Sequence, residues 1–197
     1  MRKVVVFTNL TLDGVMQAPG RREEDFRGGF QHGGWAAPYA AMQSSAIGDS
    51  LGNVGPLLMG RRTYEDFYAF WPHQTDSPFS ALLTNTPKYM ASTTLQEPLA
   101  WSNSTLLKGD VAEAVAGLKA QPGQDFMVMG SGELIQTLMK HNLVDRYVLL
   151  IHPLVLGSGR RLFPDGGAFA TLRLVSAKPT PNGVVVATYE PAEPRAG

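Results

Sequence analysis

The chain has 197 residues, of which 44% are hydrophobic, and this fits one domain with a single core that needs neither disulfides nor a structural metal. The 17 basic and 17 acidic residues cancel, so the overall charge provides no attraction to nucleic acid or to an anionic membrane. Cysteine is absent, which excludes a thiolate nucleophile, a disulfide framework and a cysteine zinc site.

The N-terminal part is predicted to be a strand followed by loops. Residues 2–8 form an apolar, β-branched run that ends at Asn9. The run is too short for a signal peptide or a membrane span, so we expect a cytoplasmic protein with no membrane partner. A turn is expected at residues 11–16, and residues 17–38 should form a long loop. The glycines and aromatic residues of this loop fit either a lid over a flat ring or a loop packed on itself.

The next segment contains two predicted helices around a short strand. Residues 38–51 have apolar side chains at helical spacing, and two glycines follow them. The apolar run of residues 56–59 is too short for a helix and fits a strand buried on both faces. A polar, helix-compatible segment begins after Gly60 and continues to Trp71.

The junction after this strand has the composition of an anion-binding site. A helix N-terminus presents free N–H groups, and Arg61, Arg62 and the Thr63 hydroxyl add donors suited to a phosphate. Gly60 would allow a close approach of the backbone. The alternative is that both arginines are solvated surface charges and that Gly60 is only a turn residue.

Short helices and strands are predicted between residues 77 and 120. Helices are expected at residues 77–85 and 110–120, because Ser77 and Asp110 are typical N-cap residues. Strands are predicted at residues 88–92 and 99–107.

Residues 125–134 repeat the arrangement of strand, glycine and helix. Two such junctions in one sheet could hold the two ends of a dinucleotide. Neither junction contains the GxGxxG fingerprint or the GxxxxGK[ST] loop, so an ordinary Rossmann or P-loop protein is not indicated. The residues that we expect to contact the dinucleotide here are Gly130, Ser131, Gly132, Glu133 and Leu134.

The C-terminal part is predicted to contain a long strand and a loop rich in glycine and arginine. The strand covers residues 144–156 and includes His152, which we interpret as a structural, hydrogen-bonding histidine. The apolar stretch from Tyr147 to Val155 fits either a dimer interface or burial within one monomer. Residues 157–161, Gly-Ser-Gly-Arg-Arg, resemble a phosphate loop, but no helix pattern follows them. We therefore expect a substrate-side loop or a dimer contact here rather than a cofactor site.

The order of these elements predicts the fold class. Strands and helices alternate through residue 151, and a hairpin of residues 172–177 and 184–189 closes the chain. This predicts a three-layer α/β domain over residues 1–190, with a mainly parallel sheet and an antiparallel C-terminal edge. Residues 191–197 should form a short tail. A ligand would lie across the carboxyl ends of the strands.

Four segments together resemble the dihydrofolate reductase-like superfamily, in particular small stand-alone proteins similar to the reductase domain of bacterial riboflavin biosynthesis. They span almost the whole chain in the family order. The resemblance implies the dihydrofolate reductase-like fold, NADPH or NADH as the cofactor, a heterocyclic substrate and a homodimer. His32 has no partner histidine at metal-ligand spacing, and no metal is expected. The four segments are Thr11–Gly14, Leu58–Glu65, Gly130–Gly132 and His152–Phe163.

The resemblance also implies roles for single residues. In the family the loop after the first strand closes over the nicotinamide, so Asn9, Asp13 and Met16 become candidates for its lining. For Asp13 the alternative is plain turn chemistry. In relatives an arginine that helps to hold the adenosine phosphate often follows the serine equivalent to Ser92, and Thr93 stands in its place here. The other implied cofactor residues are Gly60, Arg61, Arg62 and Thr63, with the five of the second junction.

The acid of dihydrofolate reductases is missing from its expected position. In those enzymes the helix equivalent to residues 38–51 carries one acid that binds the pterin and assists its protonation. A gapless count back from Gly60 reaches Gln43 and Ser44, which cannot ionise. Asp49 is the candidate proton donor if the register shifts, and solvent is the alternative. We therefore expect hydride transfer to a pterin-type or pyrimidine-type heterocycle but not true dihydrofolate reduction. The alternative is a ligand-binding protein that kept the fold and lost catalysis.

Overall fold

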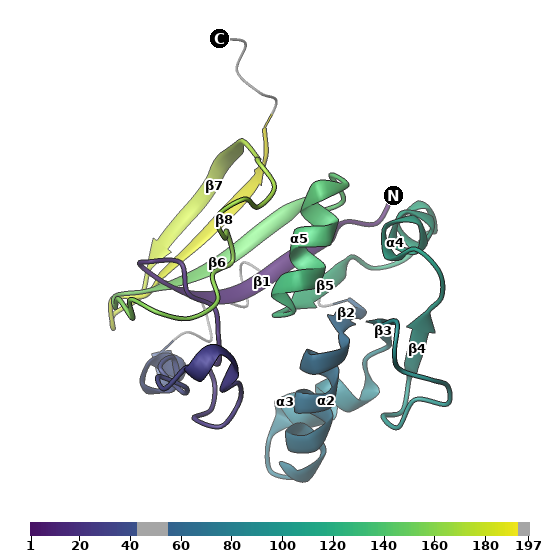
Figure 1. Ribbon diagram of the computed structural model, residues 1–197, viewed down its shortest axis with the longest axis horizontal. Coiled ribbons are helices and arrows are strands. Elements are labelled where there is room, and N and C mark those ends of the chain that lie inside the picture. Colours follow the sequence, from purple (N-terminus) through teal and green to yellow (C-terminus); the bar gives the residue numbers. More distant parts are fainter. Residues whose placement is uncertain (43–54, 193–197) are drawn as a thin grey trace.

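The computed structural model of the protein describes residues 1–42 and 55–192. These residues form a mixed eight-stranded sheet with helices on both faces (Figure 1). The predicted three-layer α/β fold is therefore confirmed. Most of the predicted helix at residues 38–51, including Gln43, Ser44 and Asp49, lies outside the described residues.

The sheet is parallel except at its C-terminal edge. The strand order is β4-β3-β2-β5-β1-β6-β8-β7, and the two antiparallel strands are β8 and β7. Among the described residues no helix is both long and apolar enough to cross a membrane. The strands are β1 (Val4–Thr11), β2 (Leu57–Gly60), β3 (Lys88–Ala91), β4 (Ser104–Leu107), β5 (Phe126–Met129), β6 (Arg146–His152), β7 (Leu172–Pro179) and β8 (Val185–Pro191). The helices are α2 (Arg61–Phe70), α3 (Pro78–Asn85), α4 (Val111–Ala120) and α5 (Gly132–Lys140), with 3-10 turns η1 (Arg27–Gly29), η2 (Ala37–Met42) and η3 (Trp71–His73).

Successive side chains of β1 point to opposite faces of the sheet and contribute to two separate hydrophobic cores. Val4 and Val6 belong to the core that also contains buried residues of α4 and α5. Val5 and Phe7 point to the other face and pack with buried residues of α2 and α3. A central strand that is covered on both faces needs apolar side chains at successive positions, which explains its continuous apolar sequence.

Three strand boundaries differ from the predictions. β1 continues to Thr11 because its ladder with β6 extends to the pair of Thr11 and His152. β6 ends at His152 and not at residue 156, since Pro153 follows it and has no N–H for the ladder. β6 lies between β1 and β8, so burial within the monomer accounts for its apolar residues. β4 begins only at Ser104, because Trp101 turns into the core. There the backbone N–H of Trp101 donates to the Tyr64 hydroxyl at 2.7 Å.

The two predicted helix caps have different outcomes. Asp110 caps α4 as predicted, because its carboxylate accepts the N–H of Glu113 at 3.0 Å. Ser77 occupies the N-cap position of α3, but its side chain makes no capping hydrogen bond. The backbone carbonyl of Ser77 accepts the N–H of Ser80 instead.

The long loop before residue 38 packs on itself. Phe30, Trp35 and Ala36 form a small buried cluster with Val15 and Ala18. Of the two interpretations of this loop, the structure favours the self-packed one for Phe30 and Trp35, whereas Phe26 is 55% exposed.

His152 holds this loop against the end of the sheet. The ring is fully buried, its Nε2 lies 2.9 Å from the side-chain oxygen of Asn9, and it meets the rings of Trp35 and Tyr39 edge to face. Burial lowers the pKa of His152 from 6.5 to about 4. The ring is therefore neutral in the folded protein at pH 7, in keeping with a structural histidine.

We predict a stability loss in acid that depends on His152. Between pH 6.5 and pH 4 the unfolded chain binds a proton at this residue and the folded protein does not, so stability falls as the pH falls. From pH 7 to pH 4.5 the wild type should lose roughly 2 to 3 kcal/mol more than His152→Gln in urea unfolding. Equal losses in the two proteins would show that the folded protein protonates His152 freely.

Candidate functional site

The two predicted junctions lie beside each other at the carboxyl ends of parallel strands. β2 pairs in parallel with β5, so the first turns of α2 and α5 begin at the same edge of the sheet (Figure 1). A cavity of about 1400 Å³ opens at this edge. The predicted site residues that line it are Asn9, Met16, Gly60, Arg61, Arg62, Thr63, Ser92, Gly130, Ser131, Gly132, Glu133 and Leu134.

Ser131 connects one junction to the other. Its hydroxyl donates to the Thr63 hydroxyl at 2.7 Å and accepts the Gly60 N–H at 2.9 Å. Gly130 and Ser131 both have left-handed backbone conformations, with φ of 65° and 64°. Consecutive residues of this kind re-aim the chain, and here they bring the start of α5 against the start of α2.

Neither α2 nor α5 has a side-chain cap. The N-cap of α2 is Gly60, which has no side chain, and the hydroxyl of Ser131 at the N-cap of α5 is used between the junctions. In α4, by contrast, Asp110 provides an ordinary cap. The first-turn N–H groups of α2 and α5 are therefore available to an anion in the cavity.

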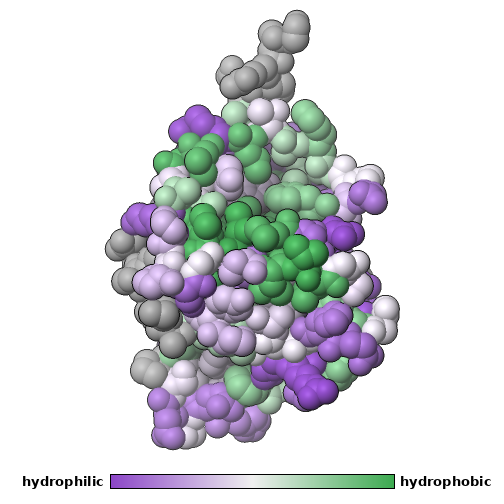
Figure 2. Space-filling view, turned by 90° about the vertical axis from the view of Figure 1, so that its left-hand side faces the viewer, coloured by the Kyte–Doolittle hydropathy of each residue, from purple (hydrophilic) through white to green (hydrophobic). Residues whose placement is uncertain are grey.

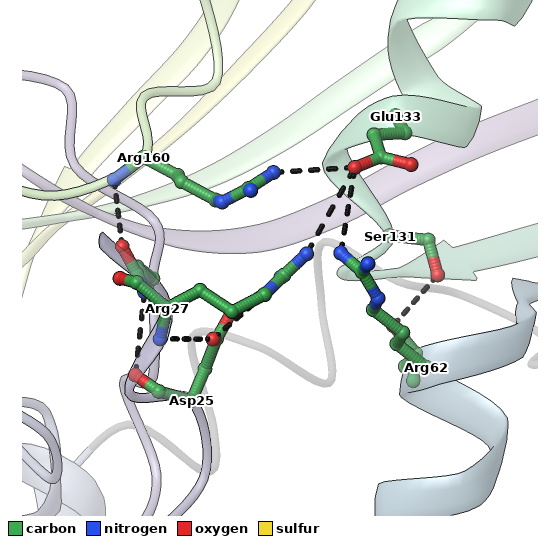
Figure 3. Close-up of polar contacts among 8 residues, drawn as sticks. Asp25, Arg27, Arg62, Ser131, Glu133 and Arg160 are labelled. Atoms are coloured by element: carbon green, nitrogen blue, oxygen red, sulfur yellow. Dashed lines mark hydrogen bonds and ion pairs between the residues drawn. The ribbon is translucent and has the colours of Figure 1, made fainter. Parts of the chain in front are cut away.

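Three arginines converge on one carboxylate beside these helix ends. One oxygen of Glu133 lies 3.2 Å from Arg160, 3.6 Å from Arg62 and 3.8 Å from Arg27 (Figure 3). Glu133 and Arg62 belong to the first turns of α5 and α2, whereas Arg27 and Arg160 belong to two loops. The Glu133 side chain is 79% exposed, so the group faces the open cavity.

Arg27 is held in place by Asp25. Its Nε lies 2.8 Å and 3.0 Å from the two carboxylate oxygens of Asp25. Burial acts to raise the pKa of Asp25, but the bonds from Arg27 outweigh burial and lower it. The same pairing raises the pKa of Arg27. Both groups are therefore charged, and Arg27 directs a remaining terminal nitrogen toward Glu133.

Gln17 fixes the two arginine loops relative to each other. Its buried side chain donates to the carbonyl of Arg27 at 3.0 Å and accepts the N–H of Arg160 at 2.9 Å. The backbone N–H of Met16 also donates to the carbonyl of Arg160 at 2.9 Å. The turn after β1 and the loop of residues 157–161 therefore form one unit.

Sequence reasoning missed Gln17, Arg27 and Arg160. The run Gly-Ser-Gly-Arg-Arg is a usable signal, but without a following helix it indicates a substrate-side loop or a dimer contact rather than a cofactor site. The structure places Arg160 in the same cavity as the two junctions. A helix is not needed here, because an antiparallel bridge between Val15 and Arg161 positions the loop.

Asp13 is the predicted residue that the described structure does not bring to the cavity. Its carboxylate accepts the Thr11 hydroxyl at 2.6 Å and the N–H groups of Leu156 and Gly157 at 3.2 Å and 2.9 Å. The hydrogen bond from Thr11 is the main cause that lowers the pKa of Asp13. This arrangement fits the turn chemistry that was the alternative for Asp13.

Two further carboxyl groups line the cavity near α2. Glu24 accepts the N–H groups of Gly20 and Arg21 at 2.7 Å and 3.0 Å, and Asp66 pairs with the Arg21 guanidinium. Burial raises the pKa of both Glu24 and Asp66. The pair of Arg21 and Asp66 ties the long loop to α2.

The edge near β3 is suited to a second anionic group. The parallel register pairs Gly60 with Ala91, so Arg61 and Ser92 follow at neighbouring strand ends. Arg61 makes a half-exposed ion pair with Glu65 at 3.6 Å. Such an exposed pair is weak, so Arg61 can turn to a ligand at little cost.

Solved structures show where else this fold occurs. A pyrimidine reductase-like protein from Corynebacterium diphtheriae superposes with a TM-score of 0.66 at 12% identity, covering 98% of this chain and 93% of the other. Dihydrofolate reductase from Enterococcus faecalis in complex with NADP(H) and RAB-propyl has a TM-score of 0.61 at 12% identity, with 97% of each chain covered. At these identities the likeness shows a shared fold.

Sequence comparison defines the family. The uncharacterized protein YyaP of Bacillus subtilis (strain 168) is 30% identical over 145 residues, which are 72% of this chain and 76% of YyaP. The family model of the RibD C-terminal domain matches residues 2–186, nearly the whole chain. With the reductase-like fold and the site described above, this match shows that the chain belongs to the RibD C-terminal domain family.

Proposed function

We propose that the protein is a cytoplasmic NAD(P)H-dependent reductase that transfers hydride to a conjugated heterocycle of pterin or pyrimidine type. The observation that carries this proposal is the pair of uncapped helix N-termini that Ser131 joins at one cavity. A dinucleotide has two linked phosphates that need such donors. The family membership and the NADP(H) held by the Enterococcus dihydrofolate reductase support the same cofactor class.

The residues present fit a dinucleotide. The first turns of α2 and α5, with Thr63 and Ser131, would hold the linked phosphates. Arg61 and Ser92, which lie at neighbouring strand ends, would hold a phosphate on the adenosine ribose. This favours NADPH, with NADH as a second choice.

The protein has modest chemical work to do in such a reaction. A reduced nicotinamide supplies the hydride when it is bound. The chain must orient the two rings and exclude water, which the turn after β1 and the long loop can do from the other wall of the cavity. The proton comes from Asp49 or from solvent in this proposal, and Glu24 and Asp66 are further carboxyl groups at the cavity.

The first test concerns the cofactor. Arg61→Gln should weaken NADPH binding by roughly tenfold or more and leave NADH binding nearly unchanged, because a charge-assisted contact to a phosphate contributes about 1.5 to 3 kcal/mol. Calorimetric titration of both cofactors measures this difference. Arg173→Gln, on β7, is the matched control and should change neither affinity. Equal NADPH binding by wild type and Arg61→Gln would remove Arg61 from the site.

The second test concerns turnover. Oxidation of NADPH should be measured with a panel of pterins and pyrimidines, and we expect turnover with one of them. Dihydrofolate should react slowly or not at all, since a positioned acid contributes about a hundred to ten thousandfold and residues 43 and 44 are not acids. Ligand-induced stabilisation without turnover on any compound would favour the binding-protein alternative. Fast dihydrofolate turnover would show that our argument from the missing acid is wrong.

We also propose that the protein is a homodimer. Apolar side chains gather on the side of the molecule that carries β7 (Figure 2), and Leu174 and Val175 of β7 are 52% and 45% exposed. Apolar surface of this kind is typical of interaction sites. We propose this surface as the dimer interface rather than the apolar strand β6, because β6 is buried within the monomer.

Light scattering tests the dimer. At micromolar concentration the mass should be twice the 21.3 kDa of one chain. Val175→Glu should reduce the mass to that of one chain, because it places a charge in the interface. Leu82→Glu, at an exposed apolar residue of α3, is the matched control and should remain dimeric. A monomeric wild type would refute the dimer.

A further inference from the structure

We propose that Arg27, Arg62 and Arg160 form a binding centre for a phosphate oxyanion, and that Glu133 is a built-in competitor for this centre. The carboxylate of Glu133 occupies the place of the ligand's oxyanion until the ligand displaces it. The inference rests on the proposed function for the identity of the ligand, but the centre itself is defined by the contacts around Glu133.

The charges at this centre are unbalanced in favour of an anion. Three guanidiniums meet there, and Asp25 neutralises Arg27, so two positive charges remain. Glu133 neutralises only one of them. The two linked phosphates of a dinucleotide carry two negative charges, which would balance the centre once Glu133 has moved away. The positive ends of α2 and α5 act in the same direction.

Hydrogen bonds within the protein hold Arg27 and the backbone of Arg160 in place without a ligand. Asp25 holds Arg27 through both carboxylate oxygens, and Gln17 holds the backbones of Arg27 and Arg160. The side chain of Gln17 is buried, and it makes both bonds with one amide. Donors that are held in place lose less conformational entropy on binding, which favours the bound state.

Glu133, in contrast, is free to leave. Its side chain is 79% exposed, and among the residues that the structure describes only Arg160 lies within hydrogen-bond distance of it, at 3.2 Å (Figure 3). Exposed ion pairs contribute little to stability, so a ligand can displace the carboxylate at low cost. While it is in place, Glu133 lowers the affinity of the centre for stray anions and repels an incoming phosphate.

Two sources of the oxyanion fit this chemistry. The centre lies between the helix ends, which would hold the linked phosphates of the dinucleotide, and two loops at the other wall of the cavity. The ligand group is thus either those linked phosphates or a phosphate on the heterocyclic acceptor. A cofactor phosphate in this place would tie both loops to the helices.

The experiment measures binding of two probes to matched variants. Inorganic pyrophosphate and NADPH are titrated separately by calorimetry at low salt into wild type, Glu133→Gln and Arg160→Gln. We expect Glu133→Gln to bind the probe more tightly by roughly three- to tenfold and Arg160→Gln to bind it more weakly by a similar factor. Glu113→Gln is the matched control, because Glu113 is also an acid in the first turn of a helix and lies outside the cavity.

The outcomes separate this inference from the proposed function. If Glu133→Gln binds both pyrophosphate and NADPH more tightly and Arg160→Gln binds both more weakly, the binding centre is supported and is assigned to the dinucleotide. The same effects on pyrophosphate alone, with NADPH binding unchanged, support the centre and assign it to a phosphate on the acceptor. If the wild type binds no NADPH, the proposed cofactor is wrong while the pyrophosphate titrations still decide the centre. Unchanged pyrophosphate binding, or weaker binding by Glu133→Gln, overturns the inference.

Discussion

The hydroxyl of Ser131 is the interaction on which the site depends. It bonds to Gly60 at the end of β2 and to Thr63 in the first turn of α2, and it belongs to the N-cap residue of α5. Ser131 packs directly beside Gly60, since a Cβ at Gly60 would already be in van der Waals contact with the hydroxyl, at 3.4 Å. The left-handed backbone of Gly130 and Ser131 completes the arrangement. Two helix N-termini are thereby aimed at one volume, which an isolated junction could not achieve.

The site is built at some cost to local stability. A side-chain cap is typically worth about 1 kcal/mol, and α2 and α5 both lack one where they face the cavity. α4 begins at Val111, which also borders the cavity, and it keeps the cap from Asp110. Unbalanced arginines beside the uncapped helices add like-charge repulsion, which Asp25 and Glu133 reduce. Unsatisfied donors and excess charge in one place are typical of a ligand site, because the ligand supplies what the fold leaves out.

The second wall of the cavity is made of loops, and hydrogen bonds and packing hold these loops together. The turn after β1 and the loop of residues 157–161 share backbone hydrogen bonds, the carboxylate of Asp13 and the amide of Gln17. His152 and the cluster around Trp35 hold the long loop against the same end of the sheet. Loops fixed in this way can present arginines at defined positions, as helices do on the first wall.

The sequence by itself determined the layered fold and the first wall, because both depend on local chemistry. Short apolar runs followed by glycine and a helix identify buried parallel strands, and donors at such junctions point to an anion wherever they occur. The convergence of Arg27, Arg62 and Arg160 on Glu133 was decided only by the tertiary structure. Residues 27 and 160 are far apart in the chain, and a buried amide and an antiparallel bridge bring them together. The bonds from Leu156 and Gly157 to Asp13 and the burial of β6 were decided in the same way, since these partners lie more than thirty residues away in the chain and no local pattern encodes them.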